Sequence, residues 1–318
     1  MPNDGNKKRR RPKPLAPPKM KSRKRARQTT TMFHKLITER DLARKNGDAT
    51  KVRECEKEIE EMGGRAEYQR ASQVSTSFHS TSKWVLGHLA SKGWLYGIKS
   101  TGKQRRHTRI LEVGAINTEL LDAAGMVSSR ERKEIENENH PSSSSGQQPK
   151  KKIHVRAIDI HSMEERIEEA DFLKLPIDSP SDPSKRYDVI VCSMVLNCVT
   201  TPVDRGKMLA LLYHQLRPGG LCFFTIPKFC VTRSAFLTHA LFKKMLGEDG
   251  VGFTVKSTKE SPRIAFFILE RPVEDNSGAS PAKRQLPQAY TKQKIINKGK
   301  KFPNQFCVVL KAEHVFRT

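Results

Sequence analysis

The chain has 318 residues, of which 59 are lysine or arginine and 34 are aspartate or glutamate, so its formal net charge is +25. Hydrophobic residues make up 36% of it, below the ~45–50% of compact domains, which predicts sizeable polar segments outside the packed core. The longest apolar run, 189–199, is shorter than the roughly 18 residues of a membrane span, and no apolar run follows the basic N-terminus as in a secretory signal. The six cysteines include no CxxC pair and no Cys/His cluster, so we expect no disulfide framework, no metal site and a reduced, intracellular protein.

The first 28 residues form a strongly basic segment. They contain 12 lysines and arginines against Asp4 alone, and the prolines Pro12, Pro14, Pro17 and Pro18 oppose a helix. We therefore predict a disordered basic tail over residues 1–30. Its clusters Lys7–Arg11 and Lys21–Arg27 are spaced like a two-part nuclear import signal. The tail also suits nucleic-acid phosphates, although a merely solubilising tail has the same composition.

Residues 31–100 are predicted to form a helical subdomain. Val52, Cys55, Ile59 and Met62 are spaced by three and four, which places them on one face of a helix. The Gly63-Gly64 pair is predicted to end that helix. We expect the subdomain to pack on a larger core.

From residue 101 to 318 strand and helix patterns alternate. Ile110–Val113 is predicted to be a buried strand, followed by a helix that begins at 118–124. Polar, serine-rich residues 128–152 predict a disordered insertion, after which 153–158 forms a second strand that ends at Asp159.

The later elements complete the pattern of a layered domain. In chain order we predict a charged helix over 163–169, a short strand or turn at 171–173, a strand over 187–192, a helix over 205–216, a strand over 221–226, a helix over 236–246, and an antiparallel edge pair of strands at 252–256 and 264–269. Strands that alternate with helices predict an α/β fold with a doubly wound, mostly parallel sheet.

A second basic stretch lies near the C-terminus. Seven lysines and arginines lie between Lys283 and Lys301, and no acidic residue occurs between Asp275 and Glu313. This composition favours a polyanionic partner, and a solvated loop is the alternative.

Three features are predicted to meet at the carboxyl ends of the strands, where doubly wound sheets bind ligands. Glu112-Val113-Gly114 ends the first strand, and glycine has no Cβ to keep a ligand away. Asp159 ends the second strand and is placed to accept both hydroxyls of a ribose. Asp171 and Phe172 are placed to contact an adenine. An ordinary turn at Gly114 and a helix N-cap at Asp159 are the structural alternatives.

The glycine pattern favours one cofactor over others. A dinucleotide fingerprint needs three glycines, whereas the run Gly114–Asn117 contains one, which argues against a bound pyrophosphate. S-adenosylmethionine has a ribose and an adenine but no phosphate. We therefore expect S-adenosylmethionine with its amino-acid end near Gly114.

Several motifs resemble those of a known family. Leu111–Gly114, an acidic residue after the second strand, Asp171-Phe172, the strand at 187–191 and Leu216–Gly220 together resemble a class I S-adenosylmethionine-dependent methyltransferase with a Rossmann-like sheet. A narrower resemblance is to the fungal large-subunit (25S) ribosomal RNA adenine-N1 methyltransferase family. It rests on three further stretches, which are residues 63–72 (Gly-Gly-Arg-Ala-Glu-Tyr-Gln-Arg-Ala-Ser), 193–199 (Ser-Met-Val-Leu-Asn-Cys-Val) and 202–206 (Pro-Val-Asp-Arg-Gly).

The resemblance extends from about residue 33 to residue 311 and implies a function. It implies cofactor contacts at Gly114 and Asp159, large-subunit rRNA or a pre-ribosomal particle as the partner, and work in the nucleus and nucleolus during ribosome biogenesis. The basic tail would then engage the nuclear import machinery, and no membrane is expected. One departure from the wider class is the distance of 45 positions between Gly114 and Asp159, against the usual ~20. The expected insertion accounts for it if residues 128–152 loop out.

The implied reaction needs positioning more than acid–base catalysis. Adenine N1 has a lone pair and no proton at neutral pH, so the base must be held in line with the methyl group. Asn197 is our candidate for orienting that base, and a buried, hydrogen-bonded asparagine is the alternative. Residues 227–229 are candidates for contact with the RNA. Two other functions remain open: a non-catalytic S-adenosylmethionine sensor that binds a protein partner, and a methyltransferase that acts on ribosomal proteins.

Overall fold

The computed structural model describes residues 22–76, 81–99, 105–124, 152–162, 164–177, 186–273 and 285–316. The expected tail up to residue 21 and the insertion at 128–151 lie outside these ranges. Within them, no helix is both long enough and apolar enough to cross a lipid bilayer.

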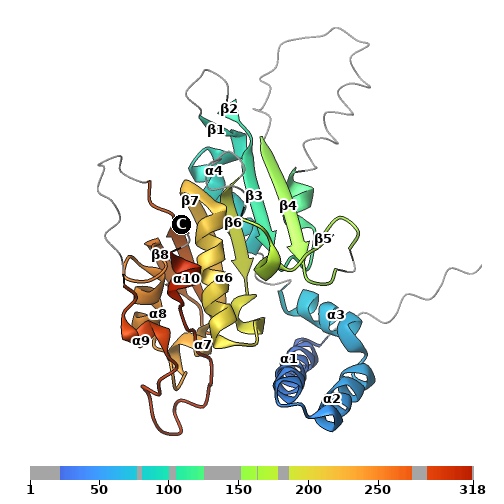
Figure 1. Ribbon diagram of the computed structural model, residues 1–318. Coiled ribbons are helices and arrows are strands. Elements are labelled where there is room, and N and C mark those ends of the chain that lie inside the picture. The colour runs from blue at the N-terminus through green and yellow to red at the C-terminus, as the bar shows by residue number, and fades with distance from the viewer. Residues whose placement is uncertain are drawn as a thin grey trace, which may run out of the picture.

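The elements of the fold follow the alternation expected from the sequence (Figure 1). The α-helices are α1 (Arg23–Lys45), α2 (Ala49–Glu61), α3 (Gly64–Thr76), α4 (Thr81–Ser91), α6 (Pro202–Gln215), α7 (Lys228–Thr232), α8 (His239–Leu246), α9 (Gln288–Thr291) and α10 (Ala312–Val315). The strands are β1 (Ile98–Lys99), β2 (Arg105–Arg106), β3 (Thr108–Val113), β4 (Ile153–Asp159), β5 (Glu168–Glu169), β6 (Tyr187–Ser193), β7 (Leu216–Pro227), β8 (Thr254–Glu260) and β9 (Ile264–Glu270). Short 3-10 helices are η1 (Trp94–Tyr96), η2 (Phe172–Lys174) and η4 (Leu196–Cys198).

Seven strands form one twisted sheet in the order β5-β4-β3-β6-β7-β9-β8. The first five are parallel, and β9 runs antiparallel to both β7 and β8. Val113 pairs with Ile158 of β4 on one side and with Cys192 of β6 on the other. The carboxyl ends of β3, β4 and β6 therefore lie side by side, and the doubly wound, mostly parallel sheet predicted from the sequence is confirmed.

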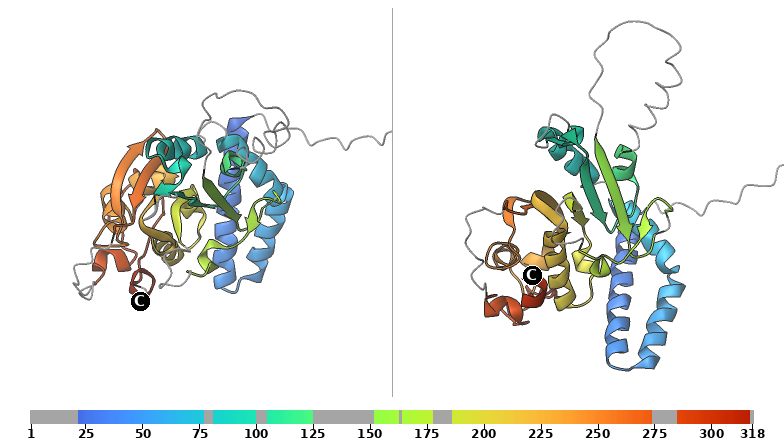
Figure 2. Two further views of the ribbon diagram at one scale, coloured as in Figure 1. Left: turned by 90° about the horizontal axis from the view of Figure 1, so that it is seen from above. Right: turned by 45° about the horizontal axis from the view of Figure 1, so that its top comes forward.

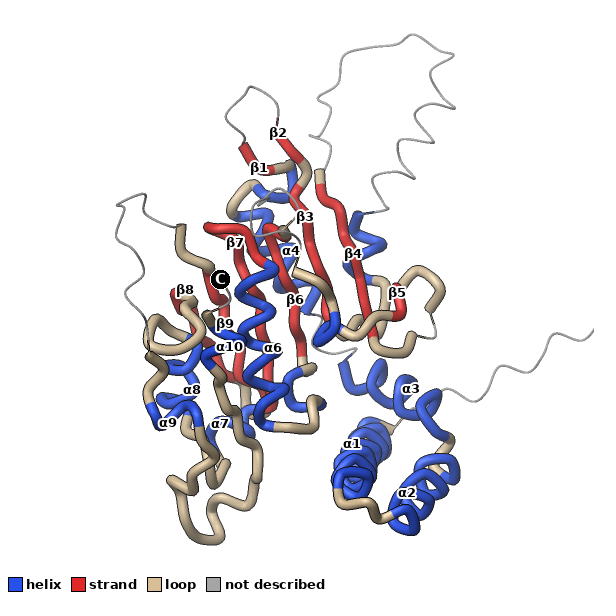
Figure 3. The backbone as a smooth tube through the Cα atoms, in the orientation of Figure 1, coloured by secondary structure: helices blue, strands red, loops and turns tan. Residues whose placement is uncertain are grey.

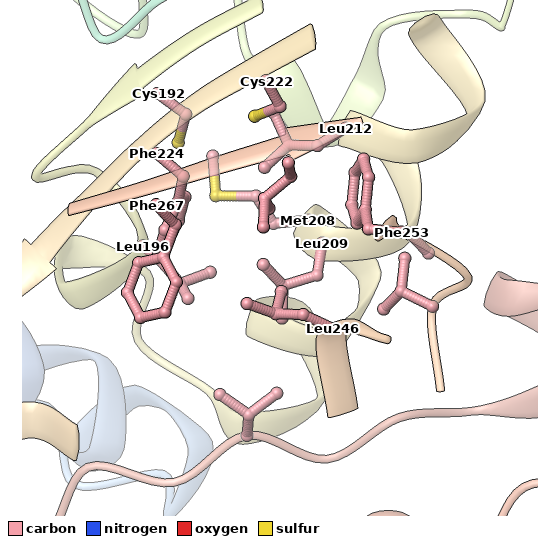
Figure 4. Packing of buried hydrophobic residues seen from close by; sticks show 14 of the residues in the cluster. Cys192, Leu196, Met208, Leu209, Leu212, Cys222, Phe224, Leu246, Phe253 and Phe267 are labelled. Carbon is pink, nitrogen blue, oxygen red and sulfur yellow. The ribbon is translucent and has the colours of Figure 1, made fainter. Parts of the chain in front are cut away.

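Both faces of the sheet are buried because alternate side chains of its central strands are apolar. Val189 and Val191 of β6 pack toward α4, whereas Ile190 and Cys192 point to the opposite face. On that face α6 contributes five fully or nearly fully buried side chains to the larger cluster (Met208, Leu209, Ala210, Leu211 and Leu212). Figure 4 shows how Met208, Leu209 and Leu212 pack in it. A strand covered on both faces needs this continuous apolar sequence, which is why β6 was recognisable.

Helices α1, α2 and α3 form a separate helical unit at the end of the sheet where the parallel strands finish (Figure 2). The expected boundary of the tail at residue 30 is wrong, because α1 begins at Arg23. The last proline of the tail is Pro18, and the Ser22 side chain caps the helix by accepting a hydrogen bond from the Arg25 N–H at 3.3 Å.

The expected helical subdomain over 31–100 is also too long. Helix α4 packs on the sheet, where the Trp84 ring meets the Phe223 ring edge-to-face at 5.1 Å, and it belongs to the sheet's own core. The helical unit thus ends with α3.

Two smaller expectations also change. The charged helix over 163–169 is wrong, because residues 164–167 form a turn and β5 adds a short parallel strand beside β4. Arg156 of β4 holds β5 by a 2.7 Å ion pair with Glu168. Lys152, expected as the last residue of the insertion, is already fixed between the Leu95 carbonyl and the Thr108 N–H.

Asp188 anchors the start of the sheet and allows a stability prediction. Its buried carboxylate accepts two hydrogen bonds of 2.6 Å from Arg106 and one of 2.9 Å from the Arg109 N–H. We expect Asp188→Ala to lower the free energy of unfolding by about 3 kcal/mol in urea titrations, since removing one partner of a buried pair leaves the other unpaired. Glu56→Ala, which removes the exposed 2.6 Å pair with Arg44, serves as the control and is expected to cost about 1 kcal/mol or less. Equal losses in the two variants would contradict this role of Asp188.

Candidate active site at the carboxyl ends of the strands

Two adjoining cavities lie where β3, β4 and β6 end, and their walls include residues of helices α1 and α3. Figure 3 shows these helices at this end of the sheet. Their volumes are about 530 Å³ and 370 Å³. Below, the larger is called the β4-side cavity and the smaller the β6-side cavity. Eight residues line both of them, namely His34, Arg65, Tyr68, Gly114, Asp159, Ile160, Val195 and Cys198.

Gly114 forms the turn after β3 with a left-handed backbone, at φ +70°. A Cβ built on it would lie 2.4 Å from Cγ2 of Val195, which follows β6. The sequence predicted that this glycine lets a ligand approach. The structure adds that its missing side chain is needed for the packing of Val195, because the two turns touch at the floor of both cavities.

Asp159 lies at the end of β4, between the two cavities. One carboxylate oxygen, Oδ1, accepts a hydrogen bond from the His161 N–H at 2.9 Å and pairs with Arg65 of α3 at 3.4 Å. Gln69, one helical turn further along α3, donates to the His161 carbonyl at 2.6 Å. The helical unit is therefore fastened to the β4 turn, and the Asp159 carboxylate is held at the cavity wall with its side chain 13% exposed.

Asp171 and Phe172 line the β4-side cavity, as expected. Phe172 is 5% exposed, packs into the core and forms part of the cavity wall. Asp171 caps η2 by accepting from the Leu173 N–H at 2.9 Å and lies 3.7 Å from Lys174. One of its oxygens is thus used to shape the turn.

Glu112, two residues before Gly114, places its carboxyl in the β6-side cavity. Its Oε2 is buried and has no hydrogen-bond partner among the described residues. Burial, followed by the nearby charge of Glu119, raises the pKa of this carboxyl to about 8. A buried, unpartnered carboxyl at a cavity wall is suited to a cationic ligand group, because the ligand would supply the missing partner.

The turn after β6 places Asn197 in the same cavity. Its side-chain N–H donates to Cys198 Sγ at 3.4 Å, while Oδ1 is buried without a partner within the described ranges. Met194, at the start of the turn, has φ 60°, an uncommon value for a non-glycine residue that occurs mostly where a site constrains the backbone. A chain of hydroxyls from Thr81 through Ser193 to Thr225, with 2.9 Å at each step, supports this turn from below.

The helical unit supplies cavity residues that the sequence analysis did not identify. His34 of α1 lies 3.6 Å from Cys198 Sγ and meets the Tyr68 ring edge-on at 5.1 Å. Burial, and then the Arg65 charge, lower the pKa of His34, and burial raises the pKa of the Cys198 thiol to about 12. Both groups are therefore neutral near pH 7, and the wall they form has no charge of its own. The Gly-Gly-Arg…Tyr-Gln stretch that contains Arg65 and Tyr68 was the available signal.

The fold and the site together define a class. A five-stranded parallel sheet extended by an antiparallel β9 between β7 and β8, with cavities at the β3/β6 switch point, is the class I methyltransferase fold. The family model described as "25S rRNA (adenine(2142)-N(1))-methyltransferase, Bmt2" matches residues 53–142 and 141–308. The chain belongs to this family.

Individual known proteins match less of the chain than the family model does. The curated 25S rRNA (adenine(2142)-N(1))-methyltransferase of Saccharomyces cerevisiae is 30% identical over 130 residues, which are 41% of this chain and 37% of the yeast protein. The aligned segment thus spans little more than a third of that relative. Similar solved structures include a putative sarcosine dimethylglycine methyltransferase from Galdieria sulphuraria (TM-score 0.36, 11% identity, 61% of this chain and 85% of that one). Another is the [4+2]-cyclase SpnF (TM-score 0.34, 13% identity, 53% and 76%).

Proposed function

We propose that this protein transfers the methyl group of S-adenosylmethionine to N1 of an adenine in large-subunit (25S) rRNA. The observation that supports this most directly is the pair of adjoining cavities at the switch point, one with Asp159 and the other with two buried, unpartnered oxygens. The family to which the chain belongs is named for the same reaction. We further propose that the enzyme works in the nucleolus and that the basic residues before α1 serve nuclear import.

The residues of the two cavities fit the cofactor. In the β4-side cavity, the Asp159 carboxylate accepts the ribose hydroxyls, and Ile160, Asp171 and Phe172 surround the adenine. In the β6-side cavity, the Glu112 carboxyl faces the cationic amino-acid end. When bound, S-adenosylmethionine supplies an electrophilic methyl group on a cationic sulfur.

The turn after β6 is placed to hold the target base. Asn197 Oδ1 needs a donor, and the exocyclic amine of adenine is one. An adenine held by that amine presents its neighbouring ring nitrogen, N1, in the same direction. N1 carries no proton near pH 7, so no general base is required. The chain's task is to align and desolvate the base, which lowers the barrier by positioning.

Asp159→Asn is expected to weaken cofactor binding by roughly ten- to a hundredfold, because a charge-assisted hydrogen bond of about 1.5–3 kcal/mol is lost. Asparagine keeps an acceptor for the His161 N–H, so the β4 turn should persist. Calorimetric titration with S-adenosylhomocysteine measures the effect, and thermal unfolding checks that the fold is intact. An unchanged affinity in a folded variant would show that another group binds the ribose.

The direct test is methyl transfer from labelled S-adenosylmethionine to unmodified large-subunit rRNA, followed by nucleoside digestion and chromatography. We expect label in N1-methyladenosine, and a strongly reduced rate with unchanged cofactor affinity in Asn197→Ala. Measurable cofactor binding without label in competent RNA would contradict the proposal and favour the sensor function.

A further inference from the structure

The second basic stretch of the sequence is brought to the acceptor side of the site by a set of backbone contacts. Ile296 and Asn297 donate their N–H groups to the Ala235 carbonyl at 2.9 and 3.0 Å. The Asn297 side chain donates to the Ser234 carbonyl at 2.8 Å, and Asn304 forms a bridge with Ser234. The segment 292–304, called the lysine loop below, is therefore fixed against the turn after α7, at the end of the sheet where the parallel strands finish (Figure 3).

The lysine loop presents uncompensated positive charge. Its five lysines are all exposed, and no ion pair links them to another residue within the described ranges (Lys292, Lys294, Lys298, Lys300 and Lys301). By contrast, Lys228 at the start of α7 is neutralised by Glu260 at 2.6 Å. The loop therefore contributes five positive charges on this side that no ion pair within the described residues neutralises.

Helix α7 connects the loop to the β6-side cavity. Pro227, which precedes α7, lines that cavity, and a helix of five residues rises only about 7.5 Å. Phe229 on α7 is 46% exposed, unusual for a large apolar ring, and the Arg233 guanidinium lies over it at 4.2 Å. An exposed ring paired with an arginine provides a surface on which a nucleobase stacks.

The opposite rim of the same cavity is basic as well. Thr30 and Thr31 of α1 line the cavity, and the preceding turn of α1 exposes Lys24, Arg25 and Arg27. A polyanion that crosses the cavity mouth from α1 to the lysine loop thus meets positive charge on both sides.

We propose that the lysine loop and Phe229 form the RNA-docking surface that delivers the target adenine to the β6-side cavity. The inference rests on the proposed function, because it takes the substrate to be RNA. The lysines contact backbone phosphates of a single-stranded segment, and Phe229 stacks a base that flanks the target. Phosphate contacts set position and affinity, and stacking tolerates many sequences.

The test compares two charge reversals of equal size at opposite ends of the sheet. Lys298→Glu/Lys301→Glu changes the lysine loop, and Lys92→Glu/Lys99→Glu changes exposed lysines beside β1, at the other end (Figure 1). Binding of an unmodified large-subunit rRNA transcript is followed by fluorescence anisotropy with S-adenosylhomocysteine bound, at several salt concentrations. The loop variant is expected to lose at least about tenfold in RNA affinity, and its log K against log salt slope should fall by about 1.4, for two contacts to single-stranded RNA. The β1-end variant should stay within about threefold of the wild type, since long-range charge effects are screened beyond ~10 Å at 0.1 M salt.

A second pair of variants tests the stacking surface without changing charge. Phe229→Ala is expected to lower RNA affinity by about tenfold, whereas Phe229→Tyr, which keeps a ring for stacking, should bind RNA like the wild type. Neither should change the affinity for S-adenosylhomocysteine.

Two outcomes would overturn the docking surface: equal losses in the two charge-reversal variants, or unchanged RNA binding in the loop variant. These results are independent of the proposed function, which the labelled-methyl assay on wild-type protein tests. A wild type that methylates rRNA while the loop variant binds RNA normally would refute the docking surface alone. A wild type that transfers no methyl group to competent RNA would refute the function, and the docking inference with it.

Discussion

Gly114→Ala is expected to weaken cofactor binding by about 100-fold and to abolish measurable methyl transfer. The added Cβ would lie 2.4 Å from Val195 Cγ2, and the residue would have to keep φ near +70°. Overpacking costs about 1–3 kcal/mol, and a left-handed backbone at an L-residue costs about 1–2 kcal/mol. Both energies would destabilise the native conformation of the two turns that form the cavity floor. Calorimetry with S-adenosylhomocysteine and the labelled-methyl assay measure the result.

Gly219→Ala is the matched control. Gly219, near the start of β7, has φ +76°, almost the same strain, but among the described residues its Cβ would meet only Val273, at an ordinary 3.5 Å. It should lose some stability and keep its cofactor affinity. In Gly114→Ala/Val195→Ala the clash is removed and the backbone strain remains, so part of the affinity should return. Cofactor affinity within about threefold of wild type in Gly114→Ala would refute the role assigned to this packing.

The second large expected effect is a pH dependence of cofactor affinity that arises from the ionisation of Glu112. Because burial raises the pKa of this carboxyl to about 8, the unliganded protein holds a proton on Glu112 at pH 7. Binding a cationic group favours the carboxylate, so the proton must leave. We expect cofactor affinity to rise with pH up to about tenfold per unit below pH 8 and to level off above it. Titrations in two buffers of different ionisation enthalpy would report the released proton.

The same carboxyl gives the stability of the unliganded protein the opposite pH dependence, so that stability falls as pH rises. Its folded-state pKa lies above the unfolded value of ~4.3, so the folded, unliganded protein is favoured most below that value. This contribution is lost as pH rises toward 8, by about 1.4 kcal/mol per pH unit at most. Glu112→Gln should therefore bind the cofactor at least tenfold more weakly at pH 8 and independently of pH, while its unliganded form is more stable there.

Glu119→Gln removes a like charge and should move the rise in affinity to lower pH. A pH-dependent affinity that persists in Glu112→Gln would contradict the assignment.

Much of the sheet was predictable because its strands leave strong local signals. The run at 187–192 is apolar on both faces, and Asp159 follows the second strand directly, so the strands and the residues at their ends could be located without the structure. The sequence pattern was misleading where a neighbouring element determines the secondary structure. Residues 163–169 have a helical composition, but β4 recruits Glu168 and Glu169 as a strand. The contact between Arg65 and Asp159 joins positions 94 residues apart, and no periodicity indicates such a distance.

The role of the helical unit was the largest gap. Its apolar stripes predicted helices with one buried face, but such a pattern does not identify the part of the molecule against which that face packs. Only the three-dimensional arrangement shows that His34, Arg65 and Tyr68 complete the cavities, and that α4, with an equally apolar pattern, belongs to the sheet instead.

Helix α1 lies beside the sites proposed for both ligands of the reaction. Its first turns present basic side chains beside the β6-side cavity, and two turns later His34 lines the wall of both cavities. Because one helix lies beside both proposed sites, we expect the binding of RNA and the binding of cofactor to influence each other. Thermodynamic reciprocity then requires that any factor by which RNA changes the cofactor's affinity equals the factor by which the cofactor changes the affinity for RNA. The order in which the two bind is therefore a kinetic property, and the free energy of the ternary complex does not depend on it.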